Sequence, residues 1–599
     1  MSEEARADPA AEYRLRLALR RQRVEHGQTI DRRISAARGA AFFGGLVLLW
    51  LALAHAALAV EWVLVPTAAF LALVMIHERV IRAEKAAERS VAHYERGLAR
   101  LDERWSGKGT AGARFVAEGD DLAEDLDLFG EGSLLQRLST ARTGLGESTL
   151  AGWLLRSAEP TDIRARQHAV TELRPRLDLR EDLALLGDAV TDRIDPAFLV
   201  EWAEATPVTF PRGTIVAGAV LSALTTLALV HWQGFAGAPE PFLLAAGAQS
   251  LFAAGMRRRV EEVLRGFDHA TANLGLLTEI LIRLEREPFS AERLVNLRRG
   301  LDSEGRPPSR RIAELALRGD LLDSRKNHFF APFAALLLWK TQLAISITGW
   351  RSRHGEAVRR WVTTVGELEA LLSLAGYAFE RPTDPYAEIV EQGPVFDGAG
   401  LAHPLLPDTR AVRNDVRFAG ELRLVLVSGS NMSGKSTLLR TVGTNVALAL
   451  AGAPVRATYL RLSPLTLGTS IRVRDSLRDG RSRFYAEITR LRTILDLARG
   501  PRPLLFLLDE VLHGTNSHDR KIGSEAVLRE LVARGAIGLV TTHDLALTAI
   551  AEELGPRATN VHFEDHLEDG KMTFDYRVRP GVVRKSNALE LMRAVGIEV

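Results

Sequence analysis

The 599-residue chain contains no cysteine, and this absence excludes a disulfide framework, thiol catalysis and any thiol-ligated metal. It also lacks a strong charge of either sign, because 77 Lys and Arg oppose 75 Asp and Glu for a net charge of +2. This balance argues against a basic coat over the whole surface, although a local basic patch stays open. The chain is too long for one hydrophobic core, so several domains are expected.

Charge is nearly missing from one long stretch close to the N-terminus. Over residues 39–76 the only charged residue is Glu61. A single helix of this length would span roughly 57 Å, whereas the core of a bilayer is about 30 Å thick. Glu61 and Pro66 favour a reversal near the middle, so we predict a transmembrane hairpin over 39–77, with helices at 40–59 and 62–77. The run is too long for a signal peptide, and residues 1–38 are expected to form a cytoplasmic N-terminal arm.

A second weakly charged region predicts another transmembrane hairpin over 213–256, with helices at 213–232 and 240–256. A buried hairpin of a soluble protein is the alternative. Arginines favour the membrane, because several precede the first hairpin, Arg257, Arg258 and Arg259 follow the second, and neither connecting loop contains Lys or Arg. Since positive residues stay on the cytoplasmic side, we expect a multi-pass protein of the cell (inner) membrane with its C-terminal domain in the cytoplasm.

The remaining segments differ in periodicity. Residues 80–211 and 257–384 have the apolar spacing of helices, and the apolar segment 329–350, interrupted by Lys340, is expected to be a buried core helix rather than a membrane span. From 385 to 599, β-runs punctuated by Gly and Pro give way to alternating strands and helices, a pattern typical of a parallel α/β domain.

A phosphate-binding loop lies within this last segment. The apolar run 422–426 predicts a strand, Leu438 begins a helical pattern, and Gly-x-x-x-x-Gly-Lys-Ser lies between them. Backbone N–H groups of such a loop converge on an anion, and the lysine adds a positive charge. We therefore predict that ATP or a related nucleotide binds to Gly429, Ser430, Asn431, Met432, Ser433, Gly434, Lys435, Ser436 and Thr437.

Two carboxylates follow an apolar strand about 70 residues downstream. The run Leu504–Leu508 ends in Asp509 and Glu510, as in a Walker B element. Asp509 and Ser436 are predicted to hold Mg²⁺, and Glu510 is predicted to polarise the attacking water as general base, beside the catalytic Lys435. The fold class expected is multidomain, with α-helical membrane hairpins and a helical core followed by a C-terminal α/β P-loop ATPase domain.

A further apolar strand, 539–542, ends at His543. As a catalytic residue His543 would sense the γ-phosphate, because ligands of open α/β sheets bind at this edge; as a structural residue it would cap a loop. Spacing alone does not choose between these two roles. Residues 479–484 and 514–517 are, taken alone, typical of turns or helix caps.

Together these motifs resemble the ATPase domain of MutS-type proteins. The resemblance rests on Gly-Ser-Asn-Met-Ser-Gly-Lys-Ser-Thr at 429–437, Asp-Gly-Arg-Ser-x-Phe at 479–484, Gly514-Thr515, Thr542-His543, and the upstream pairs His403-Pro404 and Asn414-Asp415. It implies that Val412 lies against the adenine and that Tyr576 stacks on its other side. It also implies a homodimer in which Ser482 of one subunit completes the partner's site.

Weaker similarity extends upstream, from Ser133 to Gln167, to the helical core of the same family. It implies that 80–211 and 257–384 are two parts of this core, whose levers link the ATPase to DNA. The chain departs from the family pattern where a membrane hairpin takes the place of the domain that reads mismatches. The function expected is a membrane-anchored MutS-like ATPase, using ATP and Mg²⁺, whose dimer closure acts on DNA in repair or recombination.

Two alternatives stay open. An ABC-type transporter shares the P-loop, Walker B and histidine, but its Leu-Ser-Gly-Gly signature is replaced here by the sequence at 479–482. A membrane organiser would use the nucleotide to control protein assembly without touching DNA.

Overall fold

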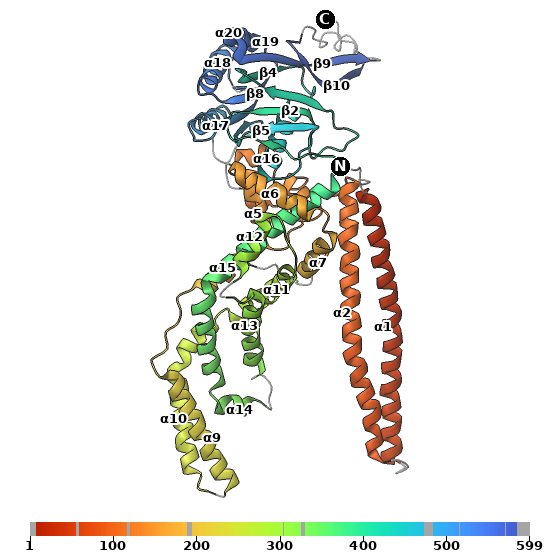
Figure 1. The fold of residues 1–599 in the computed structure, drawn as a ribbon, viewed down its shortest axis with the longest axis vertical. Coiled ribbons are helices and arrows are strands. Elements are labelled where there is room, and N and C mark those ends of the chain that lie inside the picture. Colours follow the sequence, from red (N-terminus) through yellow and green to blue (C-terminus); the bar gives the residue numbers. More distant parts are fainter. Residues whose placement is uncertain are drawn as a thin grey trace. The chain divides into compact units, whose positions relative to one another are not determined.

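The computed structural model describes residues 8–54, 59–116, 120–188, 195–235, 237–302, 305–324, 330–472, 483–513, 515–568 and 571–583. These residues form two compact units, each assembled from separate parts of the chain (Figure 1). The first unit combines residues 1–138, 174–188 and 376–599, and the second combines residues 139–173 and 189–375. Because the two units are defined by compactness in space and each combines separate parts of the chain, they do not test the six consecutive segments expected from the sequence. Those six segments stay a prediction.

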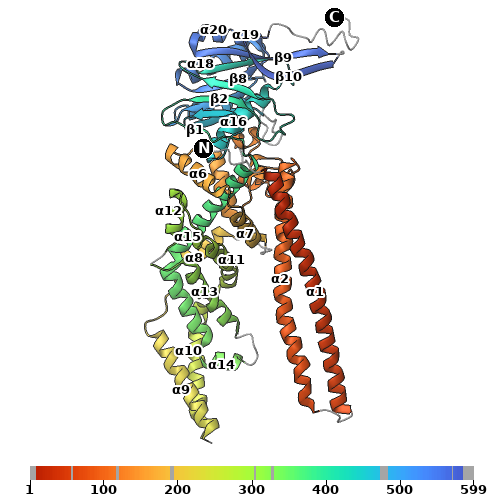
Figure 2. The ribbon, with the colours of Figure 1, turned by 45° about the vertical axis from the view of Figure 1, so that its right-hand side comes forward.

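Helices α1 (Pro9–Ala54) and α2 (Leu64–Leu101) of the first unit form an antiparallel pair, joined through the 3₁₀ turn η1 (Val60–Val63) (Figure 1, Figure 2). Their far ends are apolar and exposed, as at Phe43 (67%) and Leu53 (70%). Within the part of the chain that the structure describes, three helices are long and apolar enough to cross a membrane, namely Pro9–Ala54, Glu61–Leu101 and Thr214–Gly234.

The helices of this pair do not break where the sequence analysis placed boundaries. Helix α1 begins at Pro9, passes through position 38 and ends at Ala54, so the described part of the expected arm is helical and joins the helix that was expected over 40–59. Helix α2 likewise passes through position 77. The change at these points is one of side-chain polarity. Such a change decides whether the helix surface faces water or an apolar environment. The backbone hydrogen bonds continue, because neither position carries a proline.

The base of the α1–α2 pair is held by a compact cluster around Tyr94. Tyr13, Leu17, Tyr94 and Leu177 are buried together, with Leu177 supplied by α7 (Leu177–Asp188). Arg20 makes two hydrogen bonds to Glu181, at 2.7 and 2.8 Å, and the Tyr94 hydroxyl donates to the same carboxylate at 2.6 Å. Aromatic packing and a charged network therefore fix the base, while the apolar ends project away from it.

Two sheets build the C-terminal part of the first unit. The six-stranded sheet has the order β10-β9-β4-β8-β7-β6, with five parallel strands and β10 antiparallel at one edge; the four-stranded sheet has the order β1-β5-β2-β3. The strands are β1 (Glu388–Ile389), β2 (Phe396–Leu401), β3 (Asn414–Phe418), β4 (Leu424–Ser428), β5 (Tyr459–Leu462), β6 (Thr466–Ser470), β7 (Leu504–Asp509), β8 (Ile537–Thr542), β9 (Ala558–Glu568) and β10 (Lys571–Pro580). The parallel α/β domain expected after residue 385 is present.

Helices cover both faces of the six-stranded sheet. Leu426, Phe506 and Val540 point from their strands into a core made with α17 (Arg483–Leu497), α18 (Ser517–Ala533), α19 (Leu545–Thr548) and α20 (Ile550–Leu554). On the opposite face α16 (Lys435–Ala451) packs on β7, where a Cβ at Gly443 would lie 2.9 Å from Leu507. Short segments η2 (Ala113–Phe115), α3 (Asp121–Asp125), α4 (Leu134–Leu138) and η4 (Gly555–Arg557) complete the unit.

The second unit is helical. Its elements are α5 (Gly144–Leu155), α6 (Pro160–Leu173), α8 (Pro196–Glu204), α9 (Thr214–Gly234), α10 (Glu240–Leu264), α11 (Phe267–Glu285), α12 (Glu292–Leu301), α13 (Pro308–Asp323), α14 (Ala331–Leu336) and α15 (Trp339–Glu380), the last of which continues into the first unit. Trp350 and Trp361 of α15 are buried, and their indole N–H groups donate to the carbonyls of Arg311 and Leu301. Buried Glu369 accepts hydrogen bonds from the backbone of Arg142 and Thr143 at the start of α5.

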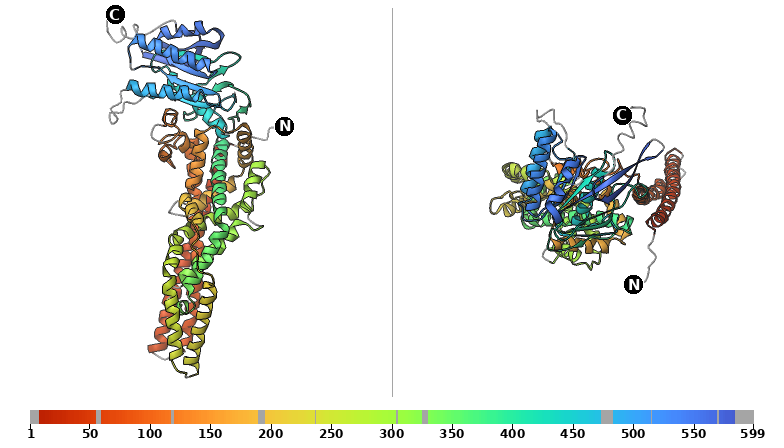
Figure 3. Two further views of the ribbon diagram at one scale, coloured as in Figure 1. Left: turned by 90° about the vertical axis from the view of Figure 1, so that its left-hand side faces the viewer. Right: turned by 90° about the horizontal axis from the view of Figure 1, so that it is seen from above.

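Helices α9 and α10 lie side by side in each view (Figure 1, Figure 3). They correspond to the predicted helices 213–232 and 240–256, but α10 runs on to Leu264 and is not among the helices apolar enough to span a membrane. The expected core helix over 329–350 is divided, because Leu338 has a positive φ of 48° between α14 and α15. Ala344, Ile347 and Trp350 of its longer part are buried, as a core helix requires.

Candidate nucleotide-binding site

The predicted phosphate-binding loop connects β4 to α16. Its backbone takes left-handed conformations at Gly429 (φ 153°), Met432 (φ 70°) and Gly434 (φ 105°). A Cβ at Gly429 would lie 2.9 Å from Ser433 Oγ, so a side chain there would collide with the loop itself. The glycines therefore allow a tight turn that directs backbone N–H groups of the loop and of the first turn of α16 toward one point.

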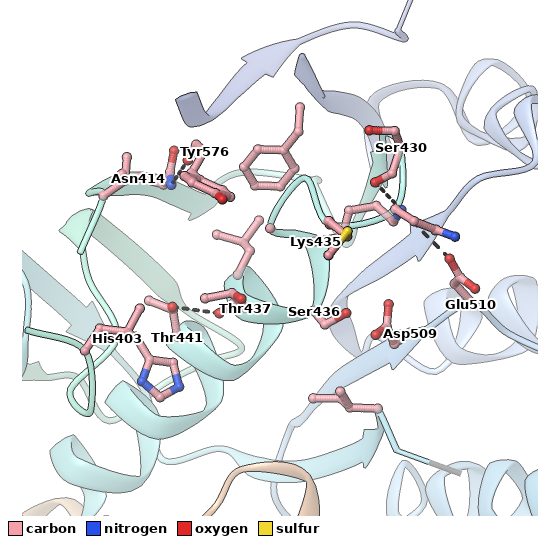
Figure 4. Close-up of a pocket in the computed structure, with 18 of the residues that line it drawn as sticks. His403, Asn414, Ser430, Lys435, Ser436, Thr437, Thr441, Asp509, Glu510 and Tyr576 are labelled. Carbon is pink, nitrogen blue, oxygen red and sulfur yellow. Dashed lines mark hydrogen bonds and ion pairs between the residues drawn. The ribbon is translucent and has the colours of Figure 1, made fainter. Parts of the chain in front are cut away.

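A pocket of about 830 Å³ opens beside this loop (Figure 4). The predicted site residues that line it are Ser430, Asn431, Met432, Gly434, Lys435, Ser436, Thr437, Asp509, Glu510, Val412 and Tyr576. Gly429 and Ser433 shape the loop from behind and do not line the pocket within the described part of the chain. Asp509 and Glu510 lie at one end and Asn414 and Tyr576 at the other, so the pocket extends from the carboxyl end of β7 to Tyr576.

Lys435 folds back over the loop. Its Nζ donates to the carbonyls of Gly429 at 2.8 Å and Ser430 at 3.0 Å, and it lies 3.8 Å from Glu510 Oε1. Burial lowers the pKa of this ammonium, and the carboxylates of Glu510 and Asp509 oppose that effect. The hydroxyls of Ser430 and Ser433 are buried without a hydrogen-bond partner among the described residues. Since buried polar atoms are normally paired, the Ser430 hydroxyl, which lines the pocket, and the lysine together fit an anion such as a phosphate.

The carboxyl end of β7 carries Asp509 and Glu510. The hydroxyl of Thr541 on β8 donates to Asp509 Oδ1, and Glu510 N donates to the same hydroxyl at 3.2 Å. Asp509 and Ser436 both line the pocket, and their oxygens suit a hard cation such as Mg²⁺. Within the described ranges no group of three or more His, Asp or Glu side chains could hold a metal. A Mg²⁺ here would therefore take its other ligands from phosphate and water.

The structure places His543 against Glu510. His543 Nδ1 lies 3.3 Å from Glu510 Oε1. The loop-capping role considered from the sequence belongs to the neighbouring Asp544, whose carboxylate accepts from Ala546 N at 2.9 Å at the start of α19. His543 lines a small cavity behind Glu510 that it shares with Thr542 and Asp544, and not the main pocket. A direct contact with Glu510 is thus the role that the geometry allows.

The far end of the pocket is built around Tyr576. This residue has a positive φ of 55° within a register shift of β10. Asn414 holds the distortion, because its Nδ2 donates to the Tyr576 carbonyl at 2.9 Å and its Oδ1 accepts from Val578 N at 2.8 Å. Val412 lines the same end. The two residues expected on either side of the adenine are therefore brought together in one pocket.

Two expected elements lie outside the described residues. Residues 479–482, with Ser482, belong to one of them, and Gly514 is the other. Both edges of the first are anchored, because the Asp125 carboxylate accepts from Ile471 N at 2.9 Å and Arg472 N at 2.7 Å and pairs with Arg490 at 3.4 Å. Asn516, next to Gly514, caps α18 by accepting from Asp519 N, which agrees with the cap reading of 514–517.

Sequence reasoning missed several residues of the site. Phe563, Thr441, Ile471, Glu487 and His513 also line the pocket. Phe563 comes from β9 and Thr441 from the second turn of α16, and neither lies in a recognisable motif. His513 and Glu487 had a usable signal, since each is a titratable residue three positions after a recognised motif residue, Glu510 or Phe484.

Comparison with known proteins agrees with this geometry. Residues 425–598 match the model of MutS domain V. The chain is 35% identical over 254 residues to the DNA mismatch repair protein MutS 2 of Halobacterium salinarum, covering 42% of this chain and 29% of that protein. It is 34% identical over 252 residues to the DNA mismatch repair protein MutS of Thermus aquaticus, covering 41% and 29%. For the DNA mismatch repair protein MSH6 of Arabidopsis thaliana the identity is 30% over 264 residues, covering 41% and 20%.

The chain thus spans less than a third of the length of these relatives. The P-loop lysine, the paired carboxylates and the clamped tyrosine all lie within residues 425–598. The C-terminal part of the chain, over residues 425–598, thus resembles domain V of MutS-family ATPases.

Proposed function

We propose that the protein is a membrane-anchored MutS-like ATPase whose nucleotide cycle drives closure of a homodimer that acts on DNA. The observation that carries the proposal is the pocket between the P-loop and the carboxyl end of β7, where Lys435, Ser436, Asp509 and Glu510 converge. This arrangement suits a nucleoside triphosphate, with the phosphates on the loop and the base between Val412 and Tyr576.

Hydrolysis follows from the positions of the charged groups. When ATP binds, Lys435 exchanges the carbonyls of Gly429 and Ser430 for phosphate oxygens. Glu510 then accepts a proton from a water whose oxygen bonds to the γ-phosphorus, while the bond to the bridging oxygen breaks and ADP and phosphate form. Mg²⁺ held by Ser436 and Asp509 would neutralise charge on the phosphates. His543, beside Glu510, senses this change at the γ-phosphate.

Membrane anchoring rests on the exposed apolar ends of two helical pairs. In the first pair the side chains of Phe43, Leu53 and Leu64 are at least two-thirds exposed, and burial in lipid would remove their surface from water. Trp50 and Trp62, also exposed, suit the interface between lipid and water. Helices α9 and α10 form the second insertion, and arginines at the base of both pairs keep the ATPase in the cytoplasm of the cell (inner) membrane.

DNA and a second subunit enter the proposal through the relatives. The similar proteins from Halobacterium, Thermus and Arabidopsis are named as DNA mismatch repair proteins. Ser482 of each subunit would complete the partner's nucleotide site, and closure would move the helical arms that hold DNA. The membrane segments stand where a mismatch reader is expected, which favours a DNA substrate other than a simple mismatch.

The test uses the full-length protein in detergent or nanodiscs. We expect ATP turnover that Lys435→Ala abolishes, together with tight ATP retention by Glu510→Gln, since the nucleotide binds but the water is not activated. DNA binding with and without ATP is then measured on matched, mismatched and branched duplexes over a range of salt, because phosphate contacts weaken as salt rises. Turnover that persists in both variants refutes the ATPase assignment, and absence of binding to every duplex favours the membrane organiser.

A further inference from the structure

A second histidine lies against the carboxylate of Glu510. His513 Nε2 is 3.4 Å from Glu510 Oε2, while His543 Nδ1 is 3.3 Å from Glu510 Oε1. The two imidazole rings are 5.3 Å apart between centroids. Each oxygen of the carboxylate therefore has its own histidine nitrogen within hydrogen-bonding reach, and the two histidines follow different strands, β7 and β8.

The backbone between Glu510 and His513 is strained in a way that brings His513 back to the carboxylate. Glu510 and Leu512 have φ angles of 51° and 56°, which residues other than glycine adopt rarely. Such conformations cost of order 1–3 kcal/mol each and persist only where the surroundings hold them. Here Val511 and Leu512 are buried in the core beside the sheet.

A third residue, Glu487, fixes this turn from the side. Its carboxylate is buried and accepts the backbone N–H of Leu512. Glu487 lies on α17, the helix that begins directly after Ser482. A hydrogen bond thus connects α17 to the turn that carries His513, and any displacement of α17 acts on the side chain beside Glu510.

The pocket is arranged so that the orientation of Glu510 matters. His513 lines both the main pocket and the small cavity behind Glu510. Lys435, at the start of α16, places its Nζ 3.8 Å from Glu510 Oε1. A water that attacks the γ-phosphate must approach Glu510 from the pocket. A carboxylate accepts a proton efficiently only when a lone pair of one oxygen points at the water. A histidine nitrogen beside each oxygen of Glu510 fixes the plane of this carboxylate.

We propose that His513 is a second positioning residue for Glu510, held in place by Glu487, and that it regulates the hydrolytic step from α17. The inference rests on the proposed ATPase function and adds a residue to it. The N–H of His513 donates to Glu510 Oε2 and orients the base, and His513 itself takes no proton from the attacking water. Its loss therefore slows hydrolysis and leaves ATP binding intact.

The test compares matched variants of the full-length protein in detergent. His513→Leu removes the donor at similar bulk, and His513→Gln keeps an N–H at a similar reach. We expect His513→Leu to lower kcat about 10-fold, less than the roughly 10²–10⁴-fold contribution of the general base itself because only its orientation is impaired, with KM for ATP changed less than about twofold. His513→Gln should recover kcat to within about threefold of the wild type, and Glu487→Gln should lower kcat with KM unchanged.

Each result supports or refutes the inference. A kcat for His513→Leu within about twofold of the wild type overturns it, as does an equal loss in the Leu and Gln variants at unchanged melting temperature. If the Leu variant folds poorly, His513→Asn replaces it, because its shorter amide should not reach Glu510; recovery by Asn as complete as by Gln overturns the inference. Should the wild type hydrolyse no more ATP than Lys435→Ala, the ATPase function itself is refuted, and this inference with it.

Discussion

Asn414 closes two hydrogen bonds around Tyr576, one to the carbonyl of Tyr576 at 2.9 Å and one from the backbone N–H of Val578 at 2.8 Å. A side chain of the four-stranded sheet thus stabilises a left-handed residue in the edge strand of the six-stranded sheet. The tyrosine ring packs against Gly434, where a Cβ would lie only 3.1 Å from the ring. Because the two hydrogen bonds fix the backbone of Tyr576, we expect them to fix the position of this ring as well.

We predict that Asn414→Ala weakens ATP binding without slowing chemistry. Two neutral hydrogen bonds contribute about 1–2 kcal/mol in total, so KM for ATP should rise about 5- to 30-fold while kcat at saturation stays within about twofold. Steady-state ATPase assays measure both constants. Arg417→Ala on the same strand is the control, because Arg417 lies on the exposed face and pairs with Asp397 at 3.3 Å. A rise in KM in the control as large as in Asn414→Ala would contradict the clamp.

Tyr576 should contribute to binding through its ring and not through its hydroxyl. We expect Tyr576→Ala to raise the Kd for ATP about 10-fold, since a stacked ring is worth of order 1 kcal/mol beyond the surface it buries. Tyr576→Phe keeps the ring and should bind ATP like the wild type. Titration with a fluorescent ATP analogue measures both. Equal loss in the two variants would mean that the hydroxyl, and not the stacking face, carries the contact.

Asp125 is expected to stabilise the edges of the segment that contains Ser482. Its carboxylate accepts from two backbone N–H groups and pairs with Arg490, and burial raises its pKa. Asp125→Asn cannot satisfy both N–H groups with one oxygen, so we expect a loss of about 2–4 kcal/mol and a clearly lower melting temperature. Asp121→Asn, which alters the more exposed partner of Arg490, should cost much less. Equal melting temperatures for the two variants would refute the anchoring role.

The base of the α1–α2 pair should lose stability in acid. Burial alone would raise the pKa of Glu181, but the hydrogen bonds from Arg20 and Tyr94 outweigh it and lower the pKa to about 2. Because the pKa is lower in the folded state than the ordinary value of about 4.5, this contribution is complete above pH 4.5 and is lost as the pH falls toward 2. Glu181→Gln should therefore cost about 1–2 kcal/mol at pH 7, less than the full shift because Arg20 is partly exposed, and the difference from the wild type should shrink below pH 4. Thermal unfolding at several pH values tests this, and a gap that widens in acid would contradict it.

The sequence predicts the chemistry of this site better than its surroundings. Lys435, Ser436, Asp509 and Glu510 were predictable because each follows a strand at a spacing that short-range backbone geometry dictates. Asp125 and Phe563 were not, because they reach the site through contacts between segments far apart in the chain, and such contacts leave no local pattern. The contact of His543 with Glu510 was open for the same reason, since it depends on the pairing of β7 with β8.

For the helical part of the chain, the sequence predicted the approximate position of the apolar segments but not where each helix begins and ends. The distribution of charged and apolar residues predicted the apolar helices, and α9 begins within one residue of the expected position 213. It did not predict that α1 and α2 continue through positions 38 and 77, because helix continuity depends on backbone hydrogen bonds that charged and apolar side chains permit equally. The positive φ of Leu338 divides the segment 329–350 at a leucine, a residue type that does not by itself predict a helix break.

The uninterrupted length of α1 and α2 has a mechanical consequence. At about 1.5 Å per residue, α1 extends roughly 55 Å from buried Leu17 to Ala54, and α2 runs beside it without a hinge. A rotation of about 5° at the charged base would sweep the apolar end through about 5 Å, as in small rigid-body movements of packed helices. The base shares Glu380 with the end of α15, through Arg100 at 2.7 Å. A small change of angle near the nucleotide domain would thus be amplified into a displacement comparable to one helical turn at the other end of the pair.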